Sequence, residues 1–332
     1  MKTIFNDLLK NVRIHPVLID VGASGQTPSI WDEISQQSIY IGFDPDQREL
    51  SEVRGEKFYK SFLINKALTD IKDKGQIPFY LTKYPYCSSA LKPNLESLSN
   101  YLFVDLFTIE REATLPSITL DDALQLLSLS KIHWFKTDSQ GTDLRLFKSI
   151  GDRIRSHILA VDIEPGLIDA YFDEDLFIDA HRYLTKNGFW LSNLVVKGAV
   201  RMRNTTLAEI ARIDKKTDKS QFSQSIRKSP SWCEARYFRT LEYLTQNDFG
   251  KDDYLLLWIF GMIDNQLGFA LDIAVEYQKK LGKDDLSSLM KNEPVSSIIK
   301  DSSKSKKKMA LLTCLKSVVP PKIRQLLRTF IN

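Results

Sequence analysis

The sequence predicts a protein of the α/β class, in which a mostly parallel sheet is covered by helices. From Val17 to about residue 245, strand-like segments alternate with helix-like ones, as such sheets require. Two of the predicted strands also end in an aspartate, Asp44 and Asp138. Because ligands of parallel α/β sheets bind beyond the carboxyl ends of the strands, these aspartates predict a functional site at that edge.

The composition is that of an ordinary globular protein, with 43% hydrophobic and 27% charged residues in 332. The tail from Lys300 onward contains nine Lys and Arg and one Asp, so its charge is +8. Because the net charge of the whole chain is +4, the remainder carries −4. An acidic body argues against nucleic-acid binding. Three separated cysteines without metal-ligand spacing favour a reducing compartment. With neither a signal-peptide pattern nor an 18-residue apolar run in the sequence, we expect a cytoplasmic protein.

The individual elements follow from apolar runs and their boundaries. The predicted helices begin with Thr caps or end at Gly188, and they cover 27–37, 119–127 and 176–188. The predicted strands cover 17–22, 38–44, 57–68, 77–82, 106–115, 131–138, 156–166, 189–196 and 234–244. The segment 83–94, rich in Pro, Tyr and Ser, is expected to be an irregular loop.

The chain is expected to contain one catalytic domain followed by helical additions. Residues 1–246 form the α/β domain, and 247–290 form a helical appendage packed on it. Residues 291–308, rich in Ser and Lys, are expected to be a flexible basic linker. Residues 309–332 are expected to form an amphipathic basic helix, for which two interpretations remain open. It docks on its own protein, or it lies on an anionic membrane or a partner.

The stretch VLIDVGASG (17–25) joins a buried strand to a turn with two glycines. Gly22 and Gly25 lack a Cβ, so a ligand can approach their backbone, and the helix expected next favours a carboxylate or phosphate. Asp20 is a candidate acceptor for an ammonium group. Asp44, at the end of the second strand, is a candidate for the two hydroxyls of a ribose. A nucleoside-containing cofactor is therefore predicted, and the missing third glycine favours S-adenosylmethionine over a nicotinamide dinucleotide.

Several motifs in order resemble the FkbM-type S-adenosylmethionine-dependent methyltransferases, over roughly residues 16–194. They are VLIDVGASG, IGFDPD, YPYCSSALKPN, SITLDDAL, WFKTDSQGTDLRLFKSI and AVDIEPGLIDAYFDEDLFIDAHRYLTKNGFWL. The most specific is KTDSQG, similar to the family's Lys-x-Asp-x-Gln-Gly. The chain departs from the family at Asp44, where a Glu is usual, and at Thr142 and Asp143, where Ala-Glu is common.

The resemblance implies a class I methyltransferase fold, a Rossmann-like seven-stranded sheet with helices on both faces, and usually O-methylation of a sugar, glycan or other small metabolite. It also implies where the cofactor binds. The residues assigned to the cofactor are Asp20, Gly22, Ala23, Ser24, Gly25, Asp44, Ala67, Ser88 and Ser89.

The candidate catalytic residues follow two further strands. Asp138 is predicted to act as the general base or to orient the acceptor, although it equally suits a helix cap. Gln140 could hold the acceptor or the amine of the cofactor. Glu164 could be a second acid or, with Asp138, a metal ligand, but two carboxylates are too few to predict a divalent metal. The four histidines and Cys87 are expected to be structural.

Three classes of function remain open from the sequence. The first is a small-molecule or glycan O-methyltransferase. The second is a non-catalytic scaffold or regulator that kept the fold, which the replacement at Asp44 and the added tail would suit. The third is an NAD-dependent oxidoreductase, which the incomplete glycine pattern disfavours. The acceptor and the oligomeric state do not follow from one sequence.

Overall fold

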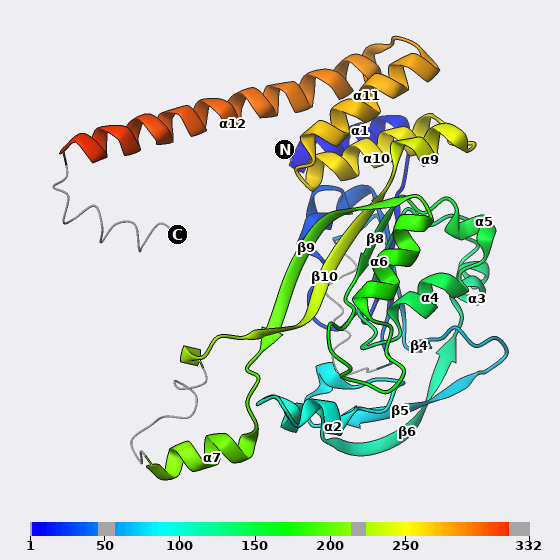
Figure 1. Cartoon of the computed structure of the whole chain (residues 1–332). Coiled ribbons are helices and arrows are strands. Elements are labelled where there is room, and N and C mark those ends of the chain that lie inside the picture. Colours follow the sequence, from blue (N-terminus) through cyan, green and yellow to red (C-terminus); the bar gives the residue numbers. More distant parts are fainter. Residues whose placement is uncertain (1, 46–56, 214–223, 319–332) are drawn as a thin grey trace. The chain divides into compact units, whose positions relative to one another are not determined.

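The computed structural model describes residues 2–45, 57–213 and 224–318. The chain divides into two compact units, Met1–Asp264 and Asn265–Asn332. The first contains all the strands of the described residues, and the second contains two long helices. Figure 1 shows the helices and strands of both units.

A seven-stranded sheet forms the centre of the first unit. Its strands, in spatial order, are β3 (Lys60–Ile64), β2 (Ile39–Phe43), β1 (Val17–Val21), β7 (Trp134–Thr137), β8 (Ala160–Ile163), β10 (Ser229–Arg239) and β9 (Phe189–Ala199). The first five pair in parallel, and β10 runs antiparallel to both of its neighbours. The predicted seven-stranded, mostly parallel sheet is confirmed, and it is consistent with a Rossmann-like methyltransferase fold.

Helices cover both faces of this sheet, because successive side chains of a strand point to opposite sides. Phe135 of β7 lies in the core shared with α3 (Leu120–Leu126), α4 (Asp143–Ser149) and α6 (Phe177–Lys186). Its neighbour Trp134 packs on the other face, where its ring lies 4.8 Å from that of Phe260 in α10 (Lys251–Ile263). Phe5 of α1 (Lys2–Val12) packs edge-on against Trp258 of α10.

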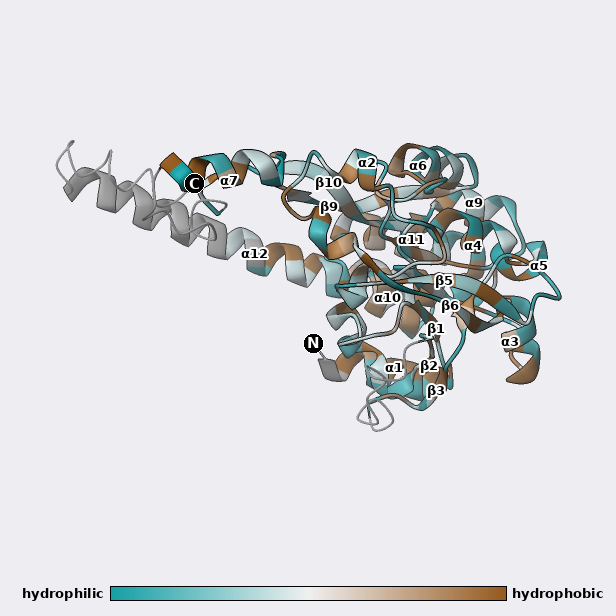
Figure 2. Ribbon diagram, turned by 90° about the horizontal axis from the view of Figure 1, so that it is seen from below, coloured by the Kyte–Doolittle hydropathy of each residue, from teal (hydrophilic) through white to brown (hydrophobic). Residues whose placement is uncertain are grey.

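A second, three-stranded sheet lies at the carboxyl ends of the central strands. The hairpin of β5 (Gln76–Thr82) and β6 (Ile109–Ile118) pairs with β4 (Ala67–Leu68). In Figure 1 this hairpin lies below the central sheet, and seen from below it crosses in front of the strands (Figure 2). The strands predicted at 77–82 and 106–115 form this hairpin. The sequence did not predict that the hairpin would cover the expected site.

Short elements complete the first unit. They are η1 (Ser29–Glu33), η2 (Ser35–Gln37), η5 (Pro85–Cys87), α2 (Leu95–Leu98), η6 (Val104–Phe107), α5 (Asp152–Arg155), α7 (Asn204–Ile213) and α9 (Leu241–Gln246). The helix expected over 27–37 is wrong, because two 3-10 turns occupy that segment and Pro28 precedes the first without a side-chain cap. The helix predicted to begin after Thr119 is confirmed, since the Thr119 hydroxyl accepts from the backbone N–H of Asp122.

The helical region after residue 246 does not form a single appendage. Helix α10 belongs to the first unit, and ten of its residues, from Asp253 to Met262, are buried. Such a helix is apolar all round and belongs inside a core. The second unit pairs α11 (Leu267–Leu281) with α12 (Asp285–Val318). Residues 291–308, expected as a linker, lie within α12, and the part of the expected terminal helix after Val318 lies outside the described residues.

Candidate functional site

A cavity of about 700 Å³ opens at the carboxyl ends of β1, β2 and β7 and is closed on its far side by the β5–β6 hairpin. Its size suits a cofactor or drug-sized ligand. Seven of the predicted site residues line it, namely Gly22, Ser24, Asp44, Ala67, Ser88, Asp138 and Gln140. Five do not, namely Asp20, Ala23, Gly25, Ser89 and Glu164. The polar strand ends do converge on one site, as parallel strands require.

Gly22 is required by a contact within the protein. Its φ is +71°, and a Cβ there would lie 2.1 Å from the carbonyl oxygen of Asp138. The turn after β1 therefore packs directly on the loop after β7. The backbone N–H groups of Gly22 and Ala23 both donate to the carbonyl of Phe43, so neither is free for a ligand. The expectation that this glycine exposes bare backbone to a ligand is corrected in that respect.

The rest of the turn is more open. Gly25 has a φ of +74° and no atom within 4 Å of where a Cβ would stand. Ser24 lines the cavity, and its hydroxyl makes no hydrogen bond with another described residue. Because 3-10 turns follow instead of a helix, the positive helix end expected here is missing. Ser24 is the polar group that this turn offers to a ligand.

Asp20 is buried and has two partners within the protein. Its carboxylate forms an ion pair of 2.8 Å with Nζ of Lys136 and accepts from the Tyr40 hydroxyl at 2.8 Å. Burial alone would lower the pKa of Lys136, but the negative charges of Asp20 and then Asp138 outweigh it, so that pKa is raised. Lys136 thus stays charged and ties β7 to β1. Asp20 acts on the site through this pair, without lining the cavity.

Asp44 lies at the end of β2, where it lines the cavity and is 6% exposed. Its backbone is held on both sides, because its N–H donates to Ile64 and its carbonyl accepts from the Asn65 side chain at 3.0 Å. Ala67, at the start of β4, lines the cavity close by in the chain. The position of Asp44 is therefore fixed by the backbone.

The two serines of the irregular loop have different positions. Ser88 lines the cavity, and its hydroxyl accepts from the backbone N–H of Thr82 at 3.0 Å. Ser89 is fully buried, and its hydroxyl donates to the carbonyl of Gln140 at 2.7 Å. Ser89 therefore supports the loop after β7. Of the two serines, only Ser88 is placed to contact a ligand in the cavity.

Asp138 is the end of a chain of hydrogen bonds. Nε2 of Gln140 donates to Oδ1 of Asp138 at 2.6 Å, and the hydroxyl of Tyr171 donates towards Oε1 of Gln140 at 3.1 Å. That hydroxyl also lies 2.9 Å from the carbonyl of Cys87. Both ends of the Gln140 amide are thus occupied within the protein. Gln140 positions Asp138, which lines the cavity and whose other carboxylate oxygen has no hydrogen-bond partner among the described residues.

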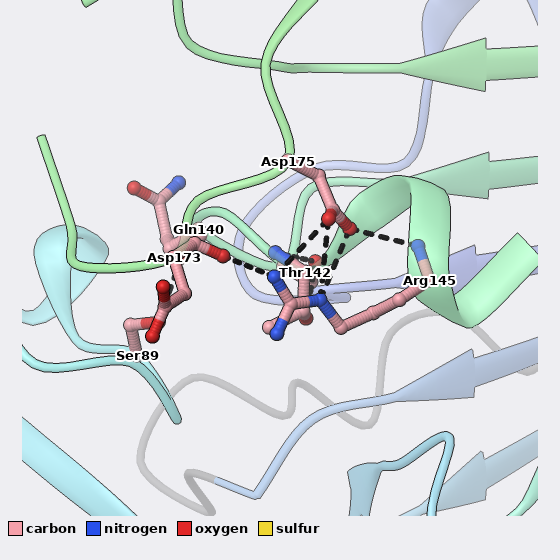
Figure 3. A network of polar contacts seen from close by, with 7 residues as sticks. Ser89, Gln140, Thr142, Arg145, Asp173 and Asp175 are labelled. Atoms are coloured by element: carbon pink, nitrogen blue, oxygen red, sulfur yellow. Dashed lines mark hydrogen bonds and ion pairs between the residues drawn. The ribbon is translucent and has the colours of Figure 1, made fainter. Parts of the chain in front are cut away.

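The loop after β7 is clamped from a second direction (Figure 3). Asp175 accepts from the backbone N–H of Arg145 at 2.7 Å and forms an ion pair of 3.1 Å with its guanidinium. The same guanidinium donates to the carbonyl of Asp173, and the N–H of Asp175 donates to Gly141. Gln140 itself has a φ of +57°. The surrounding contacts hold this unfavourable backbone in place.

Glu164 ends β8, and it does not line the cavity. Burial, followed by the negative charge of Asp138, raises its pKa above the ordinary value. A protonated Glu164 would not act as a base at neutral pH. Asp143, at the start of α4, is fully buried with a pKa raised by burial to about 6, and it accepts from Thr137 and from the N–H of Ser139.

The opposite wall carries residues that the sequence analysis did not identify. Lys83, Glu110 and Arg111 line the cavity from the hairpin and the residue after β5, and all three are exposed. For Arg111, the alternation of β6 was a signal, because it places every second side chain on one face. Which face meets the site depends on tertiary structure.

Other expected features fall outside the cavity. Nδ1 of His133 accepts from the N–H of Val17 at 2.8 Å, and burial lowers its pKa to about 3. Burial raises the pKa of the Cys87 thiol to about 12. Within the described residues, no cluster of three or more His, Cys, Asp and Glu could hold a metal ion. None of the helices searched there has the length and apolar content needed to span a bilayer.

Comparisons with known proteins leave the family undetermined. No protein-family model matches the chain, and no curated protein matches it. Among solved structures, one described as an antibiotic-related methyltransferase aligns over 71% of this chain and 93% of its own, at 13% identity and a TM-score of 0.27. A likeness of that size carries no argument. The FkbM-type resemblance therefore remains a prediction from the motifs.

Proposed function

We propose that the protein is an S-adenosylmethionine-dependent methyltransferase that methylates a hydroxyl of a sugar, a glycan or another small metabolite. The observation that carries this proposal is the cavity at the carboxyl ends of β1, β2 and β7, which Ser24, Asp44 and Asp138 line together. The strand order adds support, because two parallel halves meet between β1 and β7 and ligands bind where strand order reverses.

The residues on the sheet side of the cavity fit the proposed cofactor. S-Adenosylmethionine presents a ribose diol, an ammonium, a carboxylate and a positive sulfonium, and the sheet side of the cavity offers two carboxylates. Asp44 would accept the ribose hydroxyls. Since Asp20 is committed to Lys136 and Tyr40, the ammonium would be met by backbone carbonyls. Ser24 would donate to the cofactor's carboxylate, and Ala67 and Ser88 line the remainder.

The same details disfavour a nicotinamide dinucleotide. A pyrophosphate needs free backbone N–H groups at the first turn and the N-terminus of a helix. Here the N–H groups of Gly22 and Ala23 both donate to Phe43, and 3-10 turns follow. An acidic wall also repels a pyrophosphate, whereas it attracts a sulfonium compound.

When bound, the cofactor supplies an electrophilic methyl group. The protein must align the acceptor hydroxyl with it and help that hydroxyl to lose its proton. Asp138 is suited to the second task, because Gln140 fixes one of its carboxylate oxygens and Tyr171 fixes Gln140. Gln140 and Tyr171 are therefore positioning residues. Glu164 does not line the cavity, whereas Asp138 does, which leaves Asp138 as the base we propose.

Thermal melting with S-adenosylhomocysteine, compared with NAD⁺, tests the proposal. At about 100 times its dissociation constant, a ligand that binds only the folded protein adds about 2.7 kcal/mol. We expect a clear rise in melting temperature with the first ligand only. Asp44→Ala should weaken S-adenosylhomocysteine binding by about tenfold or more, since hydrogen bonds to a charged group are lost. Asp70→Ala, which removes an exposed carboxylate outside the cavity, is the matched control.

A rise with NAD⁺ instead would favour the oxidoreductase. If the protein binds S-adenosylhomocysteine but does not form it from S-adenosylmethionine with any acceptor tested, the non-catalytic scaffold is favoured. No response to S-adenosylhomocysteine would contradict the proposed cofactor.

A further inference from the structure

The hairpin wall of the cavity turns from apolar to basic along its length. Side chains of Ile77, Phe79 and Leu81 alternate onto the cavity face of β5, and Lys83, just after the strand, also lines the cavity. Leu115 lies opposite Ile77 in register, and Arg111 lies opposite Leu81. The inner part of this face is therefore hydrophobic, and its outer part presents two cations.

Those two cations have no side-chain partner among the residues that the structure describes. Neither Lys83 nor Arg111 forms a side-chain hydrogen bond or an ion pair with another described residue. The carboxylates of Asp44 and Asp138 line the other side of the same cavity. Glu110, next to the register shift after Leu81, also lines the cavity and reduces the local charge to +1. The hairpin wall nevertheless stays basic while the sheet wall is acidic.

Two tyrosine rings, those of Tyr84 and Tyr86, follow Lys83 in the chain. Tyr86 lines the cavity and is 46% exposed, and its ring lies 5.3 Å from that of Tyr84, which is 45% exposed. Exposed tyrosine rings at a cavity mouth offer apolar area for a ligand ring together with a polar hydroxyl. A compound with both a ring and a negative group would match Tyr86, Lys83 and Arg111 together.

We propose that the methyl acceptor carries an anionic oxygen group, a phosphate or a carboxylate, bound by Lys83 and Arg111, on a sugar-like ring that packs on Tyr86. This inference rests on the proposed function and names the substrate class of the same cavity. The division of charge supports it, since the acidic sheet wall suits a positively charged cofactor. Arg111 can bind phosphate or carboxylate through two parallel hydrogen bonds, and Lys83 adds a point charge.

Titration calorimetry on the full chain saturated with S-adenosylhomocysteine tests the inference with three probes, glucose 1-phosphate, glucuronate and glucose. We expect the better anionic sugar to bind at least about tenfold more tightly than glucose, with an advantage that falls in high salt. Tighter binding of glucose 1-phosphate would identify the acceptor's anionic group as a phosphate, and tighter binding of glucuronate would identify it as a carboxylate. The double variant Lys83→Gln and Arg111→Gln should lose about tenfold in that affinity, whereas Glu110→Gln should gain.

The controls separate this inference from the cofactor assignment. Both cations are exposed and have no side-chain partner in the described part of the chain, so the double variant should melt like wild type and bind S-adenosylhomocysteine with unchanged affinity. Equal binding of charged and neutral sugars, or no binding of either anion, would overturn the inference. So would a loss of S-adenosylhomocysteine affinity in the double variant, because the cations would then serve the cofactor's own carboxylate. If wild type fails to bind S-adenosylhomocysteine, the proposed function fails, whatever the sugars do.

Discussion

The two walls of the cavity are built in opposite ways. On the sheet side, the polar groups are fixed by the protein, as in the pairs Lys136 with Asp20 and Gln140 with Asp138. On the hairpin side, Lys83 and Arg111 are exposed and have no partner among the described residues. Fixed groups cost no reorganisation when a ligand binds, which suits the reacting centre. Free side chains can adapt, which suits recognition of a variable acceptor.

The largest expected effect is on the fixed wall, from Asp138→Asn. The replacement keeps the shape and an oxygen that can accept from Gln140, but it removes the base, so methyl transfer should slow by about 10² to 10⁴. Release of S-adenosylhomocysteine with an acceptor found by screening measures the rate. S-Adenosylhomocysteine affinity should change little. An undiminished rate would remove Asp138 from the mechanism, and a large loss of affinity would assign it to the cofactor's ammonium instead.

A second test compares the two glycines of the turn after β1. Both have a positive φ, but only at Gly22 would a Cβ meet another backbone, the carbonyl of Asp138. We expect Gly22→Ala to lower the free energy of unfolding by about 3 kcal/mol or more, and Gly25→Ala by about 1 kcal/mol. Urea unfolding measures both. Equal losses would show that the contact between the two loops does not help to fix the wall.

The smallest effect concerns the support behind the fixed wall, at Glu174. Its carboxylate accepts from the N–H groups of Ala170 and Tyr171, and burial raises its pKa to about 7. A folded-state pKa above the unfolded value means that stability falls as pH rises from about 4.5 to 7. Glu174→Gln abolishes this titration, so its stability relative to wild type should grow over that range by about 1 to 3 kcal/mol. A constant difference from pH 4 to about pH 8 would contradict the assignment.

Much of the central sheet and of the fixed wall could be predicted from the sequence, because both follow from local signals. Runs such as VLIDV predict buried strands, and Thr119 predicts a helix start that the structure contains. The carboxyl ends of parallel strands share one edge, so Asp44 and Asp138 were expected to meet. The roles of those residues stay predictions.

What could not be predicted depends on which elements become neighbours. Asp20 pairs with Lys136 because β1 and β7, more than a hundred residues apart, are adjacent in the sheet. Lys83 and Arg111 matter only because the hairpin covers the carboxyl edge. The 3-10 turns after Pro28 show the converse, since a Thr-Pro helix start is a local signal that tertiary structure overrode.

We expect an adenosyl-sulfonium cofactor to bind across the carboxyl ends of β1 and β2. A crystal structure of the full chain with S-adenosylhomocysteine tests it most directly. We predict that the ribose hydroxyls lie within hydrogen-bond distance of the Asp44 carboxylate and that the amino-acid end lies near Ser24. A nucleoside bound elsewhere, or a cavity filled by the protein's own side chains at saturating ligand, would contradict it.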